Sequence, residues 1–283
     1  MSFVDRLRAC SAFDPAAYLP FSVDGQSVGL VRPEFSACLA EFSDVFLVSA
    51  HEVRLASSLV GAEARTGAVE KVLRQLAARG VIRGWRDEPY SVAAAPDRPA
   101  LFLMERAGIP KFGIWASGVH VNGFVRYADE LFMWIGRRSP DKYTAPNKLD
   151  QIVAGGRPAH LPVRETVQKE GEEEANIDPA LASRALPVGA ISYCTEQREG
   201  LRRDVLYVYD LELPHDFVPV NHDGEIAEFQ LWPIRRVLET VRDTDDFKFN
   251  CALVAIDFLI RHGLIAPDDE PDYLTLVHGL RRP

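Results

Sequence analysis

Residues 155–177 read GGRPAHLPVRETVQKEGEEEANI, and this stretch says more about the fold than any other part of the sequence. A glycine pair and a short loop precede a predicted helix that carries Glu170, Glu173 and Glu174. Because each helical residue advances by about 100°, these three glutamates share one face. Like charges at this spacing destabilise a helix by about 0.2–0.5 kcal/mol per pair, and acidic groups in its last turns oppose the macrodipole. A bound divalent cation would remove that penalty, whereas the alternative interpretation is a solvated acidic face.

The composition of the 283-residue chain excludes several classes of protein. A net charge of −9 argues against a protein that binds the phosphate backbone of nucleic acids. The four cysteines are far apart and form no CxxC pattern, so we expect neither a zinc site nor a disulfide framework. Neither the N-terminus nor the apolar run at 251–260 resembles a signal peptide or a membrane span. We expect a soluble, cytoplasmic protein without a nucleic-acid or membrane partner.

Residues 1–100 are predicted to form a small α+β domain. Residues 1–30 read as irregular, because prolines and a glycine interrupt short apolar pieces. Helical spacing of apolar residues predicts helices over 33–41 and 67–79. Residues 80–93 read as two short strands joined by a polar turn.

Residues 101–283 are predicted to form the second, larger domain. Two runs on either side of Ala128 and Asp129 indicate a β-hairpin, and the helix of the glutamates follows it. Further strands are expected at 101–107, 185–194, 202–213 and 225–232, and further helices at 233–241, 250–262 and 271–280. This order predicts an α+β protein built as an α/β/α sandwich, with a mixed sheet between helices.

The central stretch resembles the Nudix box, a glycine followed by a loop and a helix that ends in Arg-Glu-aliphatic-x-Glu-Glu-x-Gly-aliphatic. With the motif starting at Gly155, its helix glutamates fall on Glu170, Glu173 and Glu174 and its last aliphatic residue on Ile177. The resemblance implies a Nudix fold and a hydrolase that cleaves a small-molecule diphosphate. It also implies Mg²⁺, with Mn²⁺ as an alternative, held by the three glutamates and by the backbone carbonyl of Gly156.

Four positions depart from the motif. Leu161 replaces an early Glu and Lys169 replaces the Arg with which that Glu pairs in the family, so the joint change is expected to remove one salt bridge and leave no unpaired charge. Gly171 replaces an aliphatic residue, which a helix tolerates if another backbone packs closely there. Asn176 replaces the closing Gly and is the usual second choice for a left-handed helix cap.

Sequence outside the box narrows the subgroup. The segments at 149–156, 205–232 and 250–265 resemble the Nudix proteins related to thiamine pyrophosphokinase, which carry an extra N-terminal domain. That resemblance implies hydrolysis of thiamine diphosphate, or of its oxidised analogues, to the monophosphate. Two alternatives stay open: hydrolysis of another nucleoside-diphosphate derivative such as ADP-ribose or a nucleotide sugar, and a Nudix-fold binding module without turnover. A homodimer, the commonest homo-oligomer, is the expected assembly.

Nine more residues outside the box are candidates for the site. Glu225 and Glu228 occupy a region where Nudix proteins often place a further glutamate as metal ligand or general base, although Asp-Gly beside Glu225 also marks a turn. Together with Glu170 they form the candidate catalytic set. Arg137, Arg138 and Lys142 could hold substrate phosphates, or form a surface basic patch. Trp115, Trp134, Tyr143 and Phe229 could stack on a heterocycle, although aromatic residues in strands usually belong to the core.

Overall fold

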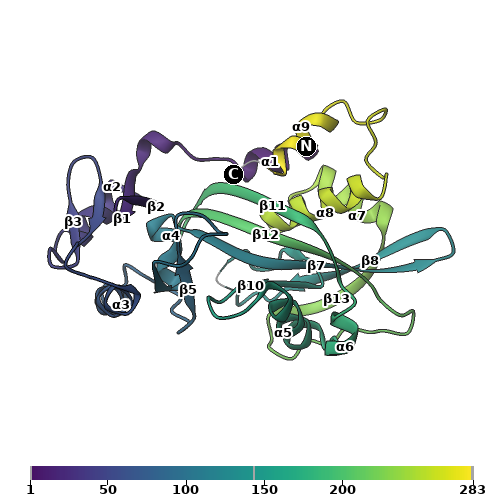
Figure 1. Ribbon diagram of the computed structural model, residues 1–283. Coiled ribbons are helices and arrows are strands. Elements are labelled where there is room, and N and C mark those ends of the chain that lie inside the picture. Colours follow the sequence, from purple (N-terminus) through teal and green to yellow (C-terminus); the bar gives the residue numbers. More distant parts are fainter. Residues whose placement is uncertain (1, 143, 282–283) are drawn as a thin grey trace.

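A seven-stranded sheet forms the centre of the larger part of the chain in the computed structural model, which describes residues 2–142 and 144–281 (Figure 1). Its strand order is β11-β12-β7-β8-β13, with β10 on the edge of β7 and β9 on the edge of β8. These strands are β7 (Trp115–Tyr127), β8 (Glu130–Arg138), β9 (Leu149–Asp150), β10 (Val153–Gly156), β11 (Leu186–Gln197), β12 (Gly200–Glu212) and β13 (Ile226–Pro233).

The sheet is mixed, as the sequence predicts. β12 runs parallel to β7, whereas the other neighbouring pairs are antiparallel. β7 and β8 form the expected hairpin, and Ala128 in its turn has a φ of 51°. β10 pairs with the first half of β7, and β8 pairs with the last residues of β7. β10 and β8 therefore lie along the same edge of β7. This arrangement places the glycine pair of the box, at the end of β10, beside the middle of the sheet.

Helices cover both faces of the sheet (Figure 1). On one face, α5 (Val163–Ala175) and α6 (Pro179–Ala182) share an apolar layer with the strands. On the other face, α7 (Ile234–Asp243) and α8 (Phe249–Arg261) pack together with α1 (Phe3–Ala9) and α9 (Tyr273–Gly279). The α/β/α sandwich around a mixed sheet is therefore confirmed, with α8 as its most completely buried helix.

The N-terminal part has its own sheet and its own core. The sheet has the order β2-β1-β4-β3, and an antiparallel hairpin of β5 and β6 lies between it and the larger sheet. Its core packs aromatic rings such as Phe21, Phe46 and Phe112. The elements are η1 (Pro15–Ala17), β1 (Leu19–Val23), β2 (Gln26–Val31), α2 (Pro33–Leu39), β3 (Phe46–Val48), β4 (Val53–Leu55), α3 (Ala62–Ala78), β5 (Pro89–Val92), β6 (Phe102–Glu105), η2 (Arg106–Gly108) and α4 (Ile109–Phe112).

Two sequence predictions about this part were wrong. Residues 1–30 are not irregular, because they contain α1 and the β1–β2 hairpin, whose turn residues Asp24 and Gly25 both have positive φ. Asp-Gly is a favoured pair for such a turn. Residues 80–93 contain one strand, β5, because Gly84 and Asp87 take positive φ before it. The partner of β5 is β6, so the expected boundary at residue 100 lies in the loop of a hairpin.

The chain passes between the two parts twice. Phe3, Val4 and Leu7 of α1 are buried in the core around α8, so the first helix belongs to the larger part. The chain then forms the N-terminal sheet and returns through Phe112 and Ile114, which are buried in the N-terminal core, to enter β7. Within residues 2–142 and 144–281, the helices are all too short or too polar to traverse a lipid bilayer.

Candidate active site

The glycine pair at the end of β10 lies directly against the helix of the glutamates. A Cβ atom at Gly155 would lie 2.2 Å from a carboxylate oxygen of Glu170, so a side chain at that position would displace the glutamate. A Cβ atom at Gly156 would lie 1.9 Å from the hydroxyl oxygen of Tyr90, on β5. Neither position has room for a side chain, because β10 lies too close to Glu170 of α5 at Gly155 and to Tyr90 of the N-terminal part at Gly156.

Glu174 is buried beneath β10. Its carboxylate accepts a hydrogen bond from the backbone N–H of Ala154 at 2.7 Å. Burial, with the nearby charges of Glu170, Asp150 and Glu225, raises the pKa of Glu174 well above its usual value, against the effect of that hydrogen bond. Burial also raises the pKa of Glu170. A cation held by these carboxylates would stabilise their ionised forms.

The loop before β13 carries two further carboxylates to Glu174. One oxygen each of Glu174, Asp223 and Glu225 lie within 4.8 Å of one another. Asp223 also accepts the backbone N–H of Glu225 at 2.7 Å, and the Asn221 side chain donates to the backbone oxygen of Glu174 at 3.2 Å. Sequence reasoning missed Asp223, although the carboxylate-rich run of residues 223–225 was a signal for it.

The end of α5 is capped by this same loop. The N–H groups of Val220 and His222 donate to the backbone oxygens of Ala175 and Glu173, two of the carbonyls that a helix end leaves without partners. Asn176 has φ 53° and ψ 38°, so the predicted left-handed cap is confirmed. The chain therefore fixes Glu225 relative to Glu174 through backbone hydrogen bonds.

Lys169 has two partners on its own helix. Its Nζ lies 2.9 Å from a carboxylate oxygen of Glu170 and 2.7 Å from one of Glu173. Lys169 is therefore not an unpaired charge, because two glutamates of the acidic face are its partners. A Cβ atom at Gly171 would lie 3.6 Å from the side chain of Ile177 and 4.0 Å from that of Ala182. The expected close approach of another backbone is therefore absent.

The donor set fits a hard divalent cation. Such ions take oxygen ligands, and Mg²⁺ is usually held by one or two carboxylates together with substrate phosphates. Here Glu170, Glu174, Asp223 and Glu225 gather around one end of α5, and two of them have pKa values raised by burial. Glu173 is about half exposed at 49% and lies at the outer side of this group, beside Lys169.

The remaining candidates lie in three different settings. Lys142 forms an ion pair with Glu225; burial alone would raise the pKa of Glu225, but Lys142, with Arg106 and Arg138, lowers it below its usual value. Arg138 is buried and bonds to Asp150 at 2.8 Å. Arg137 pairs with Glu228 at 3.0 Å, and the structure brings neither of them to the group around Glu174.

The aromatic candidates occupy packed positions. The Arg203 guanidinium lies 4.5 Å from the ring centroid of Trp115. Trp134 and Phe229 pack against the apolar layer between the sheet and α5. Tyr143 lies outside the described residues.

A cleft between the two parts of the chain opens beside the carboxylates. Two adjoining cavities form it, and both are lined by Arg106, Arg202 and Lys248 together with Ala154 of β10. One cavity reaches Gly155 and Gly156, and the other reaches Glu225 and Lys142. Sequence reasoning missed the three cations, because they lie far apart in the chain and carry no local motif.

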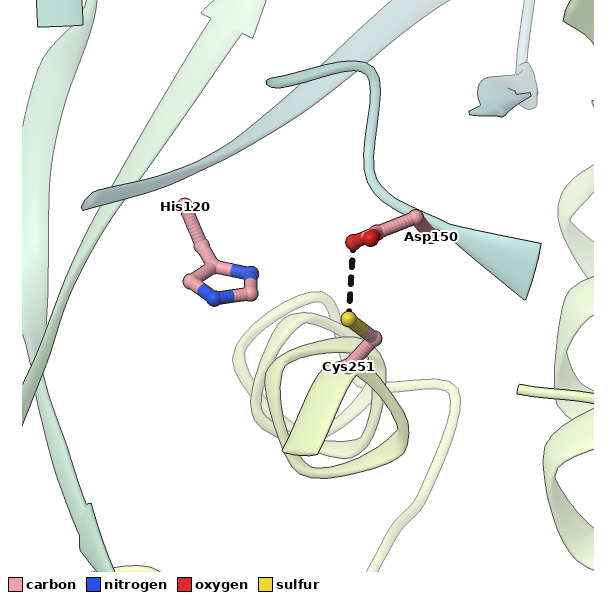
Figure 2. Close-up of side chains that lie close together, drawn as sticks. All are labelled: His120, Asp150 and Cys251. Carbon is pink, nitrogen blue, oxygen red and sulfur yellow. Dashed lines mark hydrogen bonds between the residues drawn. The ribbon is translucent and has the colours of Figure 1, made fainter. Parts of the chain in front are cut away.

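A second polar cluster, formed by His120, Asp150 and Cys251, is buried next to the cleft, which His120 also lines (Figure 2). The Cys251 thiol donates to Asp150 at 2.7 Å, while His120 Nδ1 lies 2.9 Å from the side-chain oxygen of Gln151. Asp150 also has Arg138 at 2.8 Å and Lys248 at 3.9 Å. The charge of Asp150 is thus already compensated by two cations. Both of these, Arg138 and Lys248, also line the cleft, so Asp150 helps to position them.

Similarity to known proteins extends over both parts of the chain. A family model described as "Domain of unknown function (DUF4743)" matches residues 2–116. The chain is 46% identical over 266 residues to Nudix hydrolase 24, chloroplastic, of Arabidopsis thaliana, covering 93% of this chain and 73% of that protein. It is 41% identical over 290 residues to Nudix hydrolase 20, chloroplastic, of the same plant, covering 99% and 77%.

A further relative is an uncharacterized protein of Saccharomyces cerevisiae, 33% identical over 294 residues, with 95% of this chain and 84% of that protein covered. The similarity to the two plant hydrolases spans both parts of the chain, and the box lies in register on β10 and α5. The protein therefore belongs to the Nudix hydrolase family and is an enzyme of the pyrophosphohydrolase kind.

Proposed function

We propose that the protein hydrolyses the diphosphate of a thiamine-diphosphate-like compound to the monophosphate, with Mg²⁺ as the metal and Mn²⁺ as an alternative. The observation that supports hydrolysis is the meeting of Glu170, Glu174 and Glu225 beside the glycine strand, at a cleft lined by cations. The thiamine-type substrate rests on the resemblance of the segments that flank the box.

The proposed metal ligands are the carboxylates of Glu170, Glu173 and Glu174 and the backbone carbonyl of Gly156. Asp223 joins this proposal because its carboxylate reaches Glu174. When bound, the metal would neutralise charge on the phosphate oxygens as the phosphorus is attacked. Lys169, which bonds to Glu170 and Glu173, would hold both side chains in place between turnovers.

The proposed reaction is the attack of water on one phosphorus of the diphosphate. A carboxylate takes a proton from the water, the new P–O bond forms, and the anhydride P–O bond breaks. The bridging oxygen leaves with the other phosphate group, which gives orthophosphate and an organic monophosphate. Glu225 is our first candidate for the base, because its carboxylate lies beside that of Glu174 and also lines the cleft. Glu170 and Glu228 are the other candidates.

Arg137, Arg138 and Lys142 are the basic residues proposed to hold substrate phosphates. Lys142 and Arg138 line the cleft, while Arg137 pairs with Glu228 on the neighbouring strand. We therefore expect Lys142 to contribute most, because its partner Glu225 belongs to the carboxylate group. When the diphosphate binds, Lys142 would pair with a substrate phosphate in place of Glu225.

The N-terminal domain, expected at 1–100, is proposed to be accessory to the hydrolase domain at 101–283. A cytoplasmic location and a homodimer both stay predictions. The first needs a direct test in cells, because the two plant relatives are named as chloroplastic proteins.

A substrate panel tests the proposal. The purified protein would be incubated with Mg²⁺ and thiamine diphosphate, its oxidised analogues, ADP-ribose or nucleotide sugars, and the release of phosphate or monophosphate measured. Thiamine-type compounds should give the highest kcat/KM. A higher value for ADP-ribose or a nucleotide sugar would replace the substrate class but keep the chemistry. Absence of turnover on every diphosphate would favour the binding module.

Glu173→Gln is the matched test of the metal set, because Glu173 is half exposed and its loss should leave the fold intact. Activity should fall by about 10²-fold or more, as for removal of a group that stabilises transition-state charge. Glu172→Gln, on the same helix and outside the set, serves as the control. Equal activities of the two variants would remove Glu173 from the set.

A further inference from the structure

The cleft is far more basic than the chain as a whole. Across the described residues, its two cavities are lined by eight arginine or lysine side chains and three carboxylates, in a protein of net charge −9. The cations are Arg83, Arg86, Arg106, Arg138, Lys142, Arg202, Arg203 and Lys248, and the carboxylates are Glu199, Asp204 and Glu225. Such a concentration of like charge in a concave site attracts anions.

Arg202 carries the strongest sign of a missing ligand. Its Nε is buried and has no hydrogen-bond partner in the part of the chain that the structure describes. Glu199 and Asp204 lie 3.9 Å from its terminal nitrogens, at the far limit of an ion pair. A buried guanidinium N–H without a partner is costly, whereas an anion with several oxygens would satisfy it.

Arg106 belongs to η2, an element of the N-terminal part that lies beyond the boundary expected at residue 100, and hydrogen bonds hold it in position before any ligand arrives. The buried carboxylate of Glu105 accepts the backbone N–H groups of Arg86, Glu88 and Ala107 at 3.0–3.1 Å, which fixes the turn on both sides of Arg106. The Arg106 side chain donates to Glu88 at 2.7 Å. A Cβ atom at Gly156 would lie 3.5 Å from the Arg106 guanidinium carbon, so this cation reaches the box itself.

Lys248 is the third cation that lines both cavities. It immediately precedes α8, where its backbone N–H donates to the backbone oxygen of Leu149 at 2.9 Å. Its Nζ lies 3.9 Å from Asp150, which also accepts hydrogen bonds from Arg138 at 2.8 Å, from the thiol of Cys251 and from the backbone N–H of Gln151. Asp150 thus orients Lys248 without neutralising it fully, because one carboxylate serves two cations.

We propose that Arg106, Arg202 and Lys248 form one anion-binding site that holds a phosphate group of the substrate, so that the N-terminal part, through η2, supplies one side chain of the substrate site. The inference rests on the proposed function only for the identity of the anion as a phosphate of a diphosphate ester. The organic group would lie against the apolar residues of the same cavity, which include Ile109, Pro110 and Leu206.

The test separates binding from turnover. Binding of inorganic pyrophosphate and of orthophosphate is measured by calorimetry on the full chain in EDTA, where the carboxylates hold no metal. The variants are Arg106→Gln, Arg202→Gln and Arg202→Lys, and the control is Arg242→Gln, an exposed residue on α7 that pairs with Asp243. Sodium sulfate and sodium acetate are titrated in parallel to establish which anion the site prefers.

Wild type and Arg242→Gln should bind pyrophosphate equally. Arg106→Gln and Arg202→Gln should each weaken binding by about 10- to 100-fold, the value of one or two charge-assisted hydrogen bonds. Arg202→Lys keeps the charge but loses the fork, so its affinity should be intermediate. Circular dichroism verifies folding; if Arg202→Gln unfolds, Arg106→Gln and Arg202→Lys give the same answer. Unchanged pyrophosphate affinity in the folded variants would overturn the site, and tighter binding of acetate than of phosphate would overturn its proposed ligand.

A parallel measurement distinguishes this inference from the proposed function. Glu174→Gln should lose turnover in Mg²⁺ but retain pyrophosphate binding in EDTA, because Glu174 is not among the residues that line the cleft cavities. Retained turnover in Glu174→Gln together with weak binding in Arg202→Gln would contradict the carboxylate chemistry alone. Lost turnover in Glu174→Gln together with full binding in Arg106→Gln and Arg202→Gln would contradict the anion site alone.

Discussion

The hydroxyl of Tyr90 occupies the space that a side chain at Gly156 would need. The oxygen lies 1.9 Å from the position of a Cβ atom there, and Tyr90 is buried on β5. The Tyr90 hydroxyl of the N-terminal part therefore packs directly against the Gly156 backbone of the Nudix box. The backbone N–H of Ala159 in the box loop also donates to the backbone oxygen of Pro89 at 2.9 Å, beside the same contact.

Gly156→Ala should destabilise the protein, and Tyr90→Phe should restore part of the loss. Removing the hydroxyl leaves the ring carbon Cζ 3.2 Å from the new methyl group, which is tight but no longer impossible. Chemical denaturation of the two single variants and the double variant would give a favourable coupling energy of about 0.5–3 kcal/mol. Additive effects of the two changes would mean that the hydroxyl moves away freely.

Glu174→Gln should stabilise the protein in EDTA and abolish stabilisation by Mg²⁺. The pKa of Glu174 is raised in the folded state, so its contribution is favourable below about pH 4.5 and is lost as the pH rises through the folded pKa. Above its usual pKa the folded protein must either keep this proton or bury the charge, and both oppose folding unless a cation is present. Thermal unfolding with and without Mg²⁺ would measure both effects. A Mg²⁺ response in Glu174→Gln equal to that of wild type would exclude Glu174 as a ligand.

Glu225→Gln should lower kcat by about 10²- to 10⁴-fold, the usual contribution of a general base. Glu228→Gln should have a smaller effect, because Glu228 is bonded to Arg137 at 3.0 Å and is 48% exposed. Steady-state kinetics of the two variants on the best substrate of the panel would rank them. A larger loss in Glu228→Gln would transfer the role of base to that residue.

Gly171→Ala should stabilise the protein by up to about 1 kcal/mol, the difference in helix propensity between the two residues. The nearest atoms to the new Cβ would be those of Ile177 at 3.6 Å, an ordinary contact. Gly67→Ala in α3 is the matched comparison, because nothing lies within 4 Å of its Cβ position. A gain at Gly67 with a loss at Gly171 would show that α5 packs more tightly than these distances imply.

His120 should make stability depend on pH between about 6.5 and 4. Burial, with the charge of Lys248, lowers the pKa of His120 to about 4, so the unfolded chain binds a proton in this range that the folded protein does not. The free energy of unfolding should fall by about 3 kcal/mol as the pH decreases across it. His120→Asn should remove this component, whereas the exposed His160→Gln should leave it unchanged. Identical pH profiles for wild type and His120→Asn would contradict the assignment.

The parts of the fold that follow from neighbouring residues could be predicted from the sequence. The face shared by Glu170, Glu173 and Glu174 depends on helix geometry alone, and the left-handed cap at Asn176 depends on one residue type. The β1–β2 hairpin could also have been predicted, because Asp24-Gly25 is a favoured turn pair. It was missed because prolines close to the two short strands suggested irregular structure.

The cleft could not be predicted in this way. Arg106, Arg202 and Lys248 come from η2, β12 and the start of α8, and only the parallel pairing of β12 with β7 and the packing of α8 bring them together. The bond of Arg138 to buried Asp150 could not be predicted either, because it depends on the pairing of β8 with β9. Charge in a sequence does not reveal which face a strand will bury.

The first helix has a consequence for dissecting the protein. Because α1 packs on α8 and α9, the N-terminal sheet and its core are inserted between α1 and β7, and residues from both sides of this insertion build the larger part. A shortened chain that starts at residue 101 would expose the apolar surface of α8 and α9 that Phe3, Val4 and Leu7 cover, and it should aggregate. A better excision would keep residues 2–10 and bridge the gap to β7 with a flexible linker, yielding a minimal hydrolase from which the contribution of Arg106 has been removed in one step.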